Sequence, residues 1–495
     1  MKRLAFSAAF FAVALCAGAS AVPDFDLDPY SFRDEGGGIY RAFGAALCAA
    51  TAPASESLTV RARVVPEKCD DPDWAALGVV AYFSPNDYRQ LAILKARDSA
   101  KSDHRFELKA MARSVWGGEK NVATPLGRKV FAKWEYGREY DFELKCLPDR
   151  IEGEIRDAAT GEPVFRQSFA LKEGAAMPWR PALYVNGRMH GSISGVSTEG
   201  SGAASPSVPG GEGLAFPAYR PSGPETGLRG TATGFFHMEK IDGRDWPIDP
   251  TGRAVILAGT QHIKPQGTFS DAAGYSPYGR FVATNYPSVD AWADETLSRL
   301  DDWGFTMLGN ACSLGILSHK TLPHVRNIQL GQRVSRGDPD WYIREWQYKP
   351  CSALPNVFHP DFAAACEWRA REQCAPFKDD PWLIGWFIDN ELAWWGTSKR
   401  IKGTGLYGLV AALPQSHSAR RVLDAFLAER GYSIDGQAPQ APEGFGGSPP
   451  VLSRDVPRQV KIDFLRLYAR TYYEKTVAAI RKADPNHMVM GSRYA

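Results

Sequence analysis

The sequence has no excess of charge of either sign and no block of basic residues. Its 58 Lys and Arg residues nearly balance 56 Asp and Glu residues, which leaves a formal net charge of +2 at pH 7. Proteins that bind nucleic acids or other polyanions concentrate positive charge in a patch or a stripe. The sequence therefore predicts no nucleic-acid partner.

The sequence also lacks the patterns of membrane and metal-binding proteins. After the N-terminal segment, no apolar stretch reaches the roughly 20 residues that a membrane-spanning helix needs. The nine His residues do not occur at the His-x-x-x-His or His-Glu-x-x-His spacing of zinc sites, and the eight Cys residues include no Cys-x-x-Cys pair. We therefore expect no membrane span, no metal and no other cofactor.

What the N-terminus does contain is the layout of a secretory signal. A basic start precedes an apolar run over residues 4–17, and residues 19–21 are the small residues of a cleavage site. We therefore predict a signal peptide over residues 1–21 and a mature protein that is secreted or periplasmic. Lipid anchoring through Cys16 is the less favoured alternative, because Leu15 stands where a small residue is required.

Export permits disulfides, so the Cys residues that remain after removal of the signal could be bridged or free. Removal of the signal with Cys16 leaves an odd number of the eight Cys residues. A bridge between Cys48 and Cys69 is one option, and buried free thiols are the other. We expect free thiols.

Residues 22–198 have the pattern of antiparallel strands. Apolar and polar residues alternate over residues 58–65, 140–145 and 150–155, with turn residues between the runs. Period-two alternation predicts strands that bury one face, and therefore a β-sandwich. The segment resembles jelly-roll modules of the concanavalin type. Glycan binding and support of the second half are both open for it.

Residues 199–230 consist largely of Gly, Ser, Pro and Ala. Such a composition buries too little apolar surface to order itself. We therefore predict a flexible linker and a domain boundary there.

Residues 231–495 alternate between short apolar runs and helical patterns, which is typical of parallel βα units. We predict an incomplete (β/α)8 barrel of the TIM type. A doubly wound sheet is the alternative, although no Gly-x-Gly-x-x-Gly follows the first run. The predicted strands are 254–259, 304–309, 325–330, 382–388 and 487–491, and the predicted helices are 289–303, 361–374, 419–429 and 457–482.

Polar residues follow directly after the fourth apolar run. Asn390 and Glu391 come just after residues 382–388, and Trp394 stands three residues further on. In a barrel, reactive groups lie at the carboxyl ends of the strands, where they face a cleft. The ring of Trp394 offers an apolar plane on which a sugar stacks. The alternative is that Asn390 and Glu391 cap the strand without any chemistry.

Three stretches of the second half carry a family resemblance, namely residues 234–252, 380–391 and 484–494. They resemble the β-agarases of glycoside hydrolase family 50, which are retaining enzymes of clan A, and more distantly the β-galactosidases of family 42. The similarity covers roughly residues 231–495. It implies an enzyme that hydrolyses O-glycosidic bonds in β-linked galactans.

The resemblance also implies roles for individual residues. Glu391 is expected to be the acid/base that protonates the leaving glycosidic oxygen, and Asn390 to hydrogen-bond the sugar 2-hydroxyl. His262, Asn310 and Arg493 each follow a predicted strand and match positions of polar substrate contacts. For each of these three, the alternative is a loop or strand-end residue without a role in binding.

One half of the retaining mechanism is not found in the sequence. Retaining hydrolysis needs two carboxylates about 5–5.5 Å apart. In the clan, the nucleophile is a Glu at the end of the seventh strand, whereas only five strands are predicted here. Neither Glu429 nor Glu474 has a strand-end setting. We expect either a truncated or split chain whose barrel is completed by a second polypeptide, or a degenerate protein that binds glycans without cleaving them.

The sequence therefore favours a secreted glycoside hydrolase-like protein with a polysaccharide or oligosaccharide substrate. A non-catalytic secreted glycan-binding protein is the alternative. A structural or adhesion role of the sandwich comes third.

The signal peptide leads to the first testable prediction. We expect export to remove residues 1–21, so that the mature chain begins at Val22. Mass spectrometry of the exported protein checks this expectation, and a mature chain that retains Lys2 contradicts it.

Overall fold

The computed structural model describes most of the chain between residues 23 and 493. The described ranges are 23–44, 46–51, 54–69, 74–84, 87–96, 104–112, 115–117, 133–170, 178–187, 189–203, 216–221, 223–265, 267–268, 270, 273, 276–334, 339–344, 354–392, 405–434 and 456–493. The predicted signal peptide and Trp394 lie outside them.

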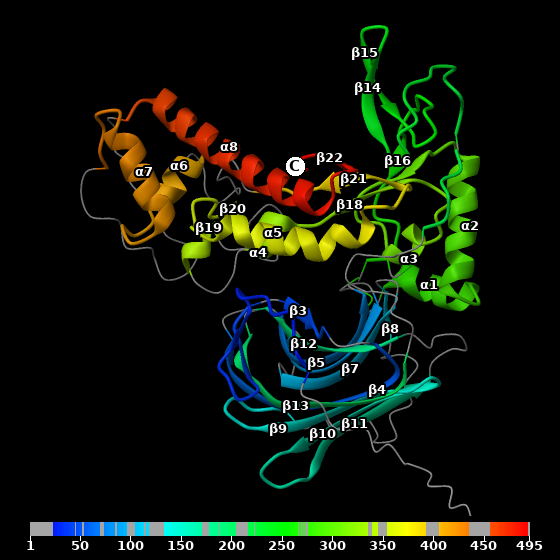
Figure 1. Cartoon of the computed structure of the whole chain (residues 1–495), viewed down its shortest axis with the longest axis vertical. Helices are drawn as coiled ribbons and strands as arrows, with labels where there is room; N and C mark the ends of the chain where they lie inside the picture. Colours follow the sequence, from blue (N-terminus) through cyan, green and yellow to red (C-terminus); the bar gives the residue numbers. More distant parts are fainter. Residues whose placement is uncertain are drawn as a thin grey trace, which may run out of the picture.

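The first half consists of two antiparallel sheets (Figure 1). The strand order of the seven-stranded sheet is β1 (Phe32–Asp34), β2 (Ile39–Ala42), β13 (Met189–Ala203), β4 (Ser55–Cys69), β9 (Tyr140–Cys146), β10 (Arg150–Asp157) and β11 (Pro163–Ala170). The order of the six-stranded sheet is β3 (Ala46–Ala49), β12 (Arg180–Asn186), β5 (Trp74–Ser84), β6 (Asp87–Ala96), β7 (His104–Ala112) and β8 (Val115–Gly117).

Alternating side chains build the core between these sheets. In β9, Tyr140, Phe142, Leu144 and Cys146 are buried, and the residues between them face outward. One apolar cluster joins such residues from both sheets. The strands predicted at residues 58–65, 140–145 and 150–155 are confirmed, because burial follows their period of two.

The boundary after the sheets differs from the prediction. Strand β13 continues to Ala203 and pairs with β4, with Ala203 opposite Ser55, so residues 199–203 are not part of a linker. Further on, Trp382 Nε1 donates to the Pro217 carbonyl at 3.0 Å, and Thr226 Oγ1 donates to the Ala254 carbonyl at 2.7 Å. Composition missed these contacts because they form with residues distant in the sequence.

The second half contains a five-stranded parallel sheet whose strands follow chain order. A hairpin of β14 (His237–Ile241) and β15 (Arg244–Ile248) precedes it. The sheet consists of β16 (Gly259–Thr260), β17 (Met307–Leu308), β18 (His324–Asn327), β21 (Leu383–Phe387) and β22 (Met488–Val489). A separate two-stranded pair is β19 (Tyr342–Arg344) with β20 (Leu354–Pro355).

Helices surround this sheet (Figure 1). The four predicted helices correspond to α2 (Val289–Asp302), α5 (Phe362–Gln373), α7 (Ser418–Ala428) and α8 (Arg458–Ala483). Not predicted were α1 (Pro277–Asn285), α3 (Leu314–Leu317), α4 (Leu330–Val334) and α6 (Gly405–Ala411). Figure 1 shows α5 alongside α8, and their apolar side chains share one core with β21.

The first predicted strand is wrong in extent. The run 254–259 was expected to be buried on both faces, yet Ile256 is 57% exposed and only Gly259 and Thr260 form β16. Among the described strands, β16 pairs only with β17, so its other edge lacks the neighbour that would cover Ile256. Trp303, which shares the helical spacing of α2, is also exposed, at 66%.

The two halves meet at a few specific contacts. Arg371 on α5 pairs with Asp26 at 3.0 Å, and the Tyr30 ring meets the Trp341 ring edge-on at a centroid distance of 5.3 Å.

Cys48 and Cys69 are not joined in a disulfide: the Cys48 sulfur accepts from the Asp28 N–H at 3.2 Å, and the Cys69 thiol donates to the Gly187 carbonyl at 3.7 Å. The bridge between them is therefore not formed.

A buried carboxylate secures the segment that leads into β22. Asp484 is fully buried, and its Oδ2 accepts from Trp386 Nε1 at 2.7 Å and from His487 Nδ1 at 2.7 Å. The other His487 nitrogen, Nε2, faces the Asp380 carbonyl at 2.8 Å. Burial by itself raises the pKa of Asp484, but the contacts with His487 and Trp386 outweigh burial and lower that pKa.

We therefore predict that Asp484→Asn destabilises the protein by about 1–3 kcal/mol at pH 7, because the buried donors Trp386 Nε1 and His487 Nδ1 lose the carboxylate that accepts from both. The folded-state pKa of Asp484 is lowered, so its contribution is complete above the unfolded-state value of about 4 and is lost as the pH falls through the folded-state pKa. The difference between parent and variant should therefore shrink below about pH 4.

Urea denaturation at pH 7 and at lower pH measures this difference. Asp463→Asn is the control, because Asp463 forms an exposed pair with Arg466 on α8, and such pairs contribute about 0.2–1 kcal/mol. Equal losses for the two variants would contradict the prediction.

Candidate active site

The predicted site residues lie at one edge of the parallel sheet. His262 follows β16, Asn310 follows β17, Asn390 and Glu391 follow β21, and Arg493 follows β22. Parallel neighbours place their carboxyl ends at the same edge, where barrel enzymes carry their reactive groups. The fold thus brings together five residues that span more than two hundred positions of the sequence.

Arg493 connects the ends of three strands. Its guanidinium donates to Asn390 Oδ1 through Nη1 and to Gln261 Oε1 through Nη2, the latter at 2.9 Å. Its backbone carbonyl accepts from the Glu391 N–H at 2.9 Å. Because Oδ1 faces the guanidinium, the amide nitrogen of Asn390 points away from it. Arg493 thereby orients Asn390, and its predicted contact with substrate stays a prediction.

The strands β16 and β17 are joined at the same edge. The N–H of His262 donates to the carbonyl of Asn310 at 3.1 Å, and the N–H of Gly309 donates to the carbonyl of Thr260 at 2.7 Å. Asn310 is 7% exposed. These backbone contacts fix the positions of His262 and Asn310 next to each other.

Left-handed backbone conformations gather at this edge. The φ angles are 60° at His262, 60° at Ala311, 49° at Gln329 and 54° at Glu391. Each residue follows a different strand of the sheet. A non-glycine residue in this region costs about 1–3 kcal/mol and persists only where the surroundings impose it, which is frequent at functional sites. The strain therefore supports the assignment of this edge as the site.

A buried network holds the end of β21. Asp389 is fully buried, and its Oδ2 accepts from the Gly331 N–H at 2.7 Å and from the Tyr472 hydroxyl at 2.6 Å. The Tyr472 hydroxyl also lies 2.9 Å from Ser492 Oγ. Burial and the Asp389 charge raise the pKa of Tyr472 well above its usual value, so the hydroxyl stays protonated and donates.

Glycine is required at position 331. A Cβ there would lie 2.7 Å from Asp389 Oδ2.

The sequence did not predict the network around Asp389. Asp389 had a usable signal, since it stands between the apolar run and Asn390, whereas Tyr472 lies on a helix far along the chain with no spacing that relates the two.

The other carboxylates considered lie elsewhere. Glu429 is exposed at the end of α7 and pairs with Arg430 at 3.4 Å, and Glu474 is exposed on α8. The Asp389 carboxylate is buried and already accepts two hydrogen bonds. Glu391, by contrast, is partly exposed at the carboxyl edge.

Within the described ranges, no cluster of His, Cys, Asp or Glu side chains is arranged to hold a metal ion. None of the helices described is long and apolar enough to cross a membrane. The side chains described at the carboxyl edge supply a carboxylate on Glu391, an amide on Asn390 and a guanidinium on Arg493.

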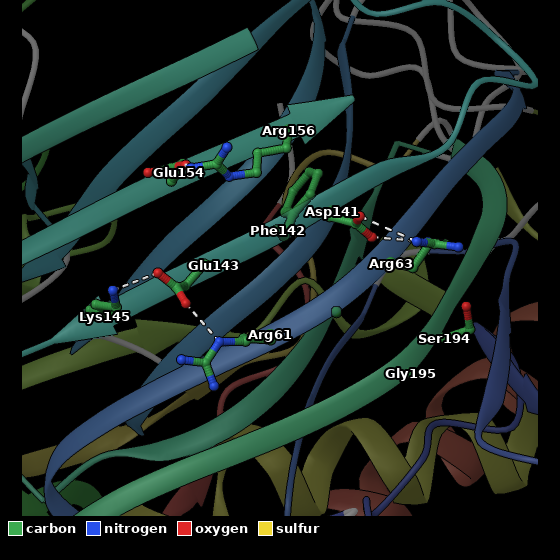
Figure 2. Close-up of a pocket in the computed structure, with 11 residues that line it drawn as sticks. Arg61, Arg63, Asp141, Phe142, Glu143, Lys145, Glu154, Arg156, Ser194 and Gly195 are labelled. Atoms are coloured by element: carbon green, nitrogen blue, oxygen red, sulfur yellow. Dashed lines mark hydrogen bonds and ion pairs between the residues drawn. The ribbon is translucent and has the colours of Figure 1, made fainter. Parts of the chain in front are cut away.

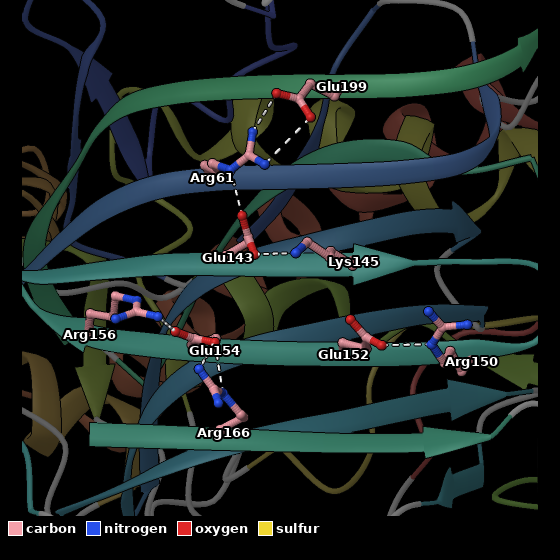
Figure 3. A network of polar contacts seen from close by, with 9 residues as sticks. All are labelled: Arg61, Glu143, Lys145, Arg150, Glu152, Glu154, Arg156, Arg166 and Glu199. Carbon is pink, nitrogen blue, oxygen red and sulfur yellow. Dashed lines mark hydrogen bonds and ion pairs between the residues drawn. The ribbon is translucent and has the colours of Figure 1, made fainter. Parts of the chain in front are cut away.

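A hollow of about 680 Å³ lies far from this edge, on the outer face of the seven-stranded sheet (Figure 2). Ion pairs cross its strands: Arg61 contacts its register partner Glu143 and, diagonally, Glu199, each at 2.6 Å. Arg63 contacts its register partner Asp141 at 2.9 Å. Figure 3 shows two further ion pairs of Glu154 on β10, one with Arg156 on the same strand and one with Arg166 on β11. Of the residues that line the hollow, only Phe142 is aromatic, and its ring is buried in the core.

Comparisons with known proteins point to one kind of enzyme. No protein-family model matches the chain. Two curated β-agarases of Vibrio sp. (strain JT0107) do match: β-agarase B is 24% identical over 334 residues, and β-agarase A is 25% identical over 322 residues. These matches cover 53% and 54% of this chain but only 34% and 32% of the relatives, so the chain spans about a third of their length. The predicted similarity to family 50 β-agarases is confirmed.

Solved structures include similar proteins as well. An exo-β-agarase has a TM-score of 0.42 at 14% identity and covers 92% of this chain and 75% of its own. An agarase has a TM-score of 0.39 at 15% identity and covers 92% of this chain and 73% of its own. At this level of similarity, neither structure positions a residue of the site.

The buried network gives a prediction for Tyr472. We expect Tyr472→Phe to lower the free energy of unfolding by about 1.5–3 kcal/mol, because the buried Asp389 carboxylate loses a donor. The control is Tyr468→Phe, one turn earlier on α8, where the hydroxyl donates to the uncharged Pro355 carbonyl at 2.7 Å. Its loss should be smaller, at about 0.5–1.5 kcal/mol. Chemical denaturation compares the two, and an equal or larger loss for Tyr468→Phe would refute the role of the charge.

Proposed function

We propose that the protein is a secreted glycoside hydrolase of the β-agarase type, which cleaves β-linked galactans with retention of configuration. The observation that carries the proposal is the pair Asn390 and Glu391 at the carboxyl edge of the parallel sheet, with Arg493 orienting the amide. The printed names of the two curated relatives support the reaction and the substrate class.

The proposed roles are those that the resemblance to β-agarases implies for these positions. Glu391 gives its proton to the glycosidic oxygen as the bond breaks, and later takes a proton from the attacking water. The Asn390 amide donates to the sugar 2-hydroxyl, where hydrogen bonds strengthen in the transition state. Arg493 accounts for the direction of that amide, since it occupies Oδ1. His262 and Asn310 contact the substrate from β16 and β17.

We propose that the parallel sheet is part of a (β/α)8 barrel. Its strands stand in chain order, as in a barrel, whereas doubly wound sheets reverse their order at a switch point. Ile256 and Met490, which are 57% and 36% exposed, lie beside the outer strands β16 and β22. A second polypeptide that adds parallel strands would cover these edges and would bring the nucleophilic carboxylate.

The antiparallel half is proposed to be a jelly-roll module of the concanavalin type. Its two sheets enclose one apolar core, as such modules do. Secretion is supported by the predicted signal peptide and by the polysaccharide substrate, which is too large to enter a cell.

The decisive prediction concerns Glu391. We expect residues 1–495, expressed by themselves, to hydrolyse β-galactans poorly, and expect activity when further barrel strands are supplied by a fused or co-expressed segment from a β-agarase. In that active form, Glu391→Gln should lower kcat about 10²- to 10⁴-fold, which is the usual contribution of general acid–base catalysis. The fall in kcat should be smaller for aryl galactosides with good leaving groups, because these leaving groups need little protonation.

Azide should partly restore turnover of such aryl substrates by Glu391→Gln, because it replaces the water that Glu391 activates. Glu429→Gln serves as the control, since Glu429 is an exposed carboxylate at a helix end. Steady-state kinetics decide the matter. If Glu391→Gln retained full activity, Glu391 would not be the acid/base.

A further inference from the structure

Helix α1 carries aromatic rings that the fold leaves uncovered. Tyr278 is 45% exposed and Phe281 is 51% exposed, while Val282 is the only buried residue of the nine in this helix. A helix this short is not stable by itself in water, so it depends on its surroundings. Exposed apolar groups gathered in one place mark a binding surface.

The two rings lie next to each other and are nearly parallel. Their centroids are 6.3 Å apart, and their planes differ by 23°. Residues three apart on a helix lie on the same face, which explains why the rings stand side by side. We call Tyr278 and Phe281 the ring platform.

Contacts from neighbouring residues hold the ring platform in place. Trp292 Nε1 on α2 donates to the Tyr278 hydroxyl at 2.9 Å. The Tyr286 ring meets the Phe281 ring edge-on at 6.4 Å, and the Tyr286 hydroxyl donates to Glu295 at 3.0 Å. Rings fixed in this way lose little freedom on binding a ligand, which favours affinity.

The loop after β16 connects the ring platform with the candidate active site. This loop begins with His262, and the next residue, Ile263, packs against the same apolar cluster as Val282 of α1. Further along, Gly267 lies against Tyr278: a Cβ at position 267 would be 2.7 Å from the Tyr278 Cβ. Of the described residues in this loop, His262 thus lies at the site and Gly267 lies against the rings.

We propose that the ring platform binds neighbouring sugar units of a neutral galactan chain whose cleaved bond lies at Glu391. This inference rests on the proposed function. The C–H face of a pyranose is apolar and stacks on an aromatic plane. Arg280 is the one charged residue of α1, so the helix carries a single positive charge and no cluster of cations of the kind that binds anionic polymers. Exposed Thr284 and Asn285 place polar groups beside the rings, where sugar hydroxyls need them.

The test measures binding without cleavage. The full chain carrying Glu391→Gln is run by affinity electrophoresis in native gels that contain increasing amounts of agarose. Adding Tyr278→Ala or Phe281→Ala should weaken retardation about three- to tenfold, in line with the loss of one ring contact. Far-UV circular dichroism and the thermal midpoint show that each variant is folded.

Matched variants separate ring stacking from other causes. Tyr278→Phe and Phe281→Trp keep a ring and should bind nearly as the parent does. Phe281→Leu keeps an apolar side chain without a ring and should bind as weakly as Phe281→Ala. Trp303→Ala removes an aromatic residue that is 66% exposed at the far end of α2, and it should change nothing.

Several results would overturn the inference. Unchanged agarose binding by Tyr278→Ala and Phe281→Ala would show that the rings do not contact the polymer, while the proposed hydrolase could still stand. Full agarose binding by Phe281→Leu would show that any apolar side chain is sufficient there and that ring stacking does not hold the polymer. Sedimentation velocity that showed a change in mass for the alanine variants would assign the rings to contact between two copies.

A different result would contradict the proposed function but not the role of the ring platform. In that case the Glu391→Gln protein does not bind agarose but binds another neutral polysaccharide, such as xylan, and this binding requires both rings. The substrate class would then be wrong, and the ring platform would still bind a glycan.

Discussion

The buried carboxylate of Asp389 is the contact on which the carboxyl edge of the parallel sheet depends. It joins β21 to Gly331 of α4 and to Tyr472 of α8, and through Tyr472 to Ser492 beyond β22. A charge buried in this way is tolerable only when donors surround it. The residues that supply those donors are therefore held as firmly as the carboxylate, and Asn390 and Glu391 extend from that fixed point.

The backbone at the same edge is strained at several residues. Left-handed backbone at His262, Ala311, Gln329 and Glu391 costs free energy that the strands and their cross-strand hydrogen bonds offset. The outer face of the antiparallel half has the opposite character, because its exposed charges are paired in register across strands. The ring platform differs from both, since it leaves apolar surface open to solvent. Sugar chemistry suits the strained edge and the rings better than the charged face.

Local patterns predicted much of the secondary structure. The bounds of α2, α5, α7 and α8 lie within about a residue or two of those expected, because these helices carry an apolar stripe that periodicity reveals. The prediction of a buried strand at residues 254–259 was wrong in extent, because an apolar run indicates burial but does not show whether a neighbouring strand covers it. The linker prediction failed for residues 199–203 and 216–230, which form contacts with distant segments. A Gly- and Pro-rich composition does not exclude such contacts.

For the site, the sequence by itself determined where the polar groups stand along the chain, and the chemistry proposed for them stays a prediction. Asn390 and Glu391 stand directly after a buried run, and a strand end in a parallel sheet is where such groups meet. Only the tertiary structure decided that Arg493 orients Asn390, that Tyr472 and Gly331 hold Asp389, and that Tyr278 and Phe281 stay uncovered. The physical reason is that hydrogen-bond partners and exposure depend on which segments approach one another in space, and no spacing along this chain encodes that approach.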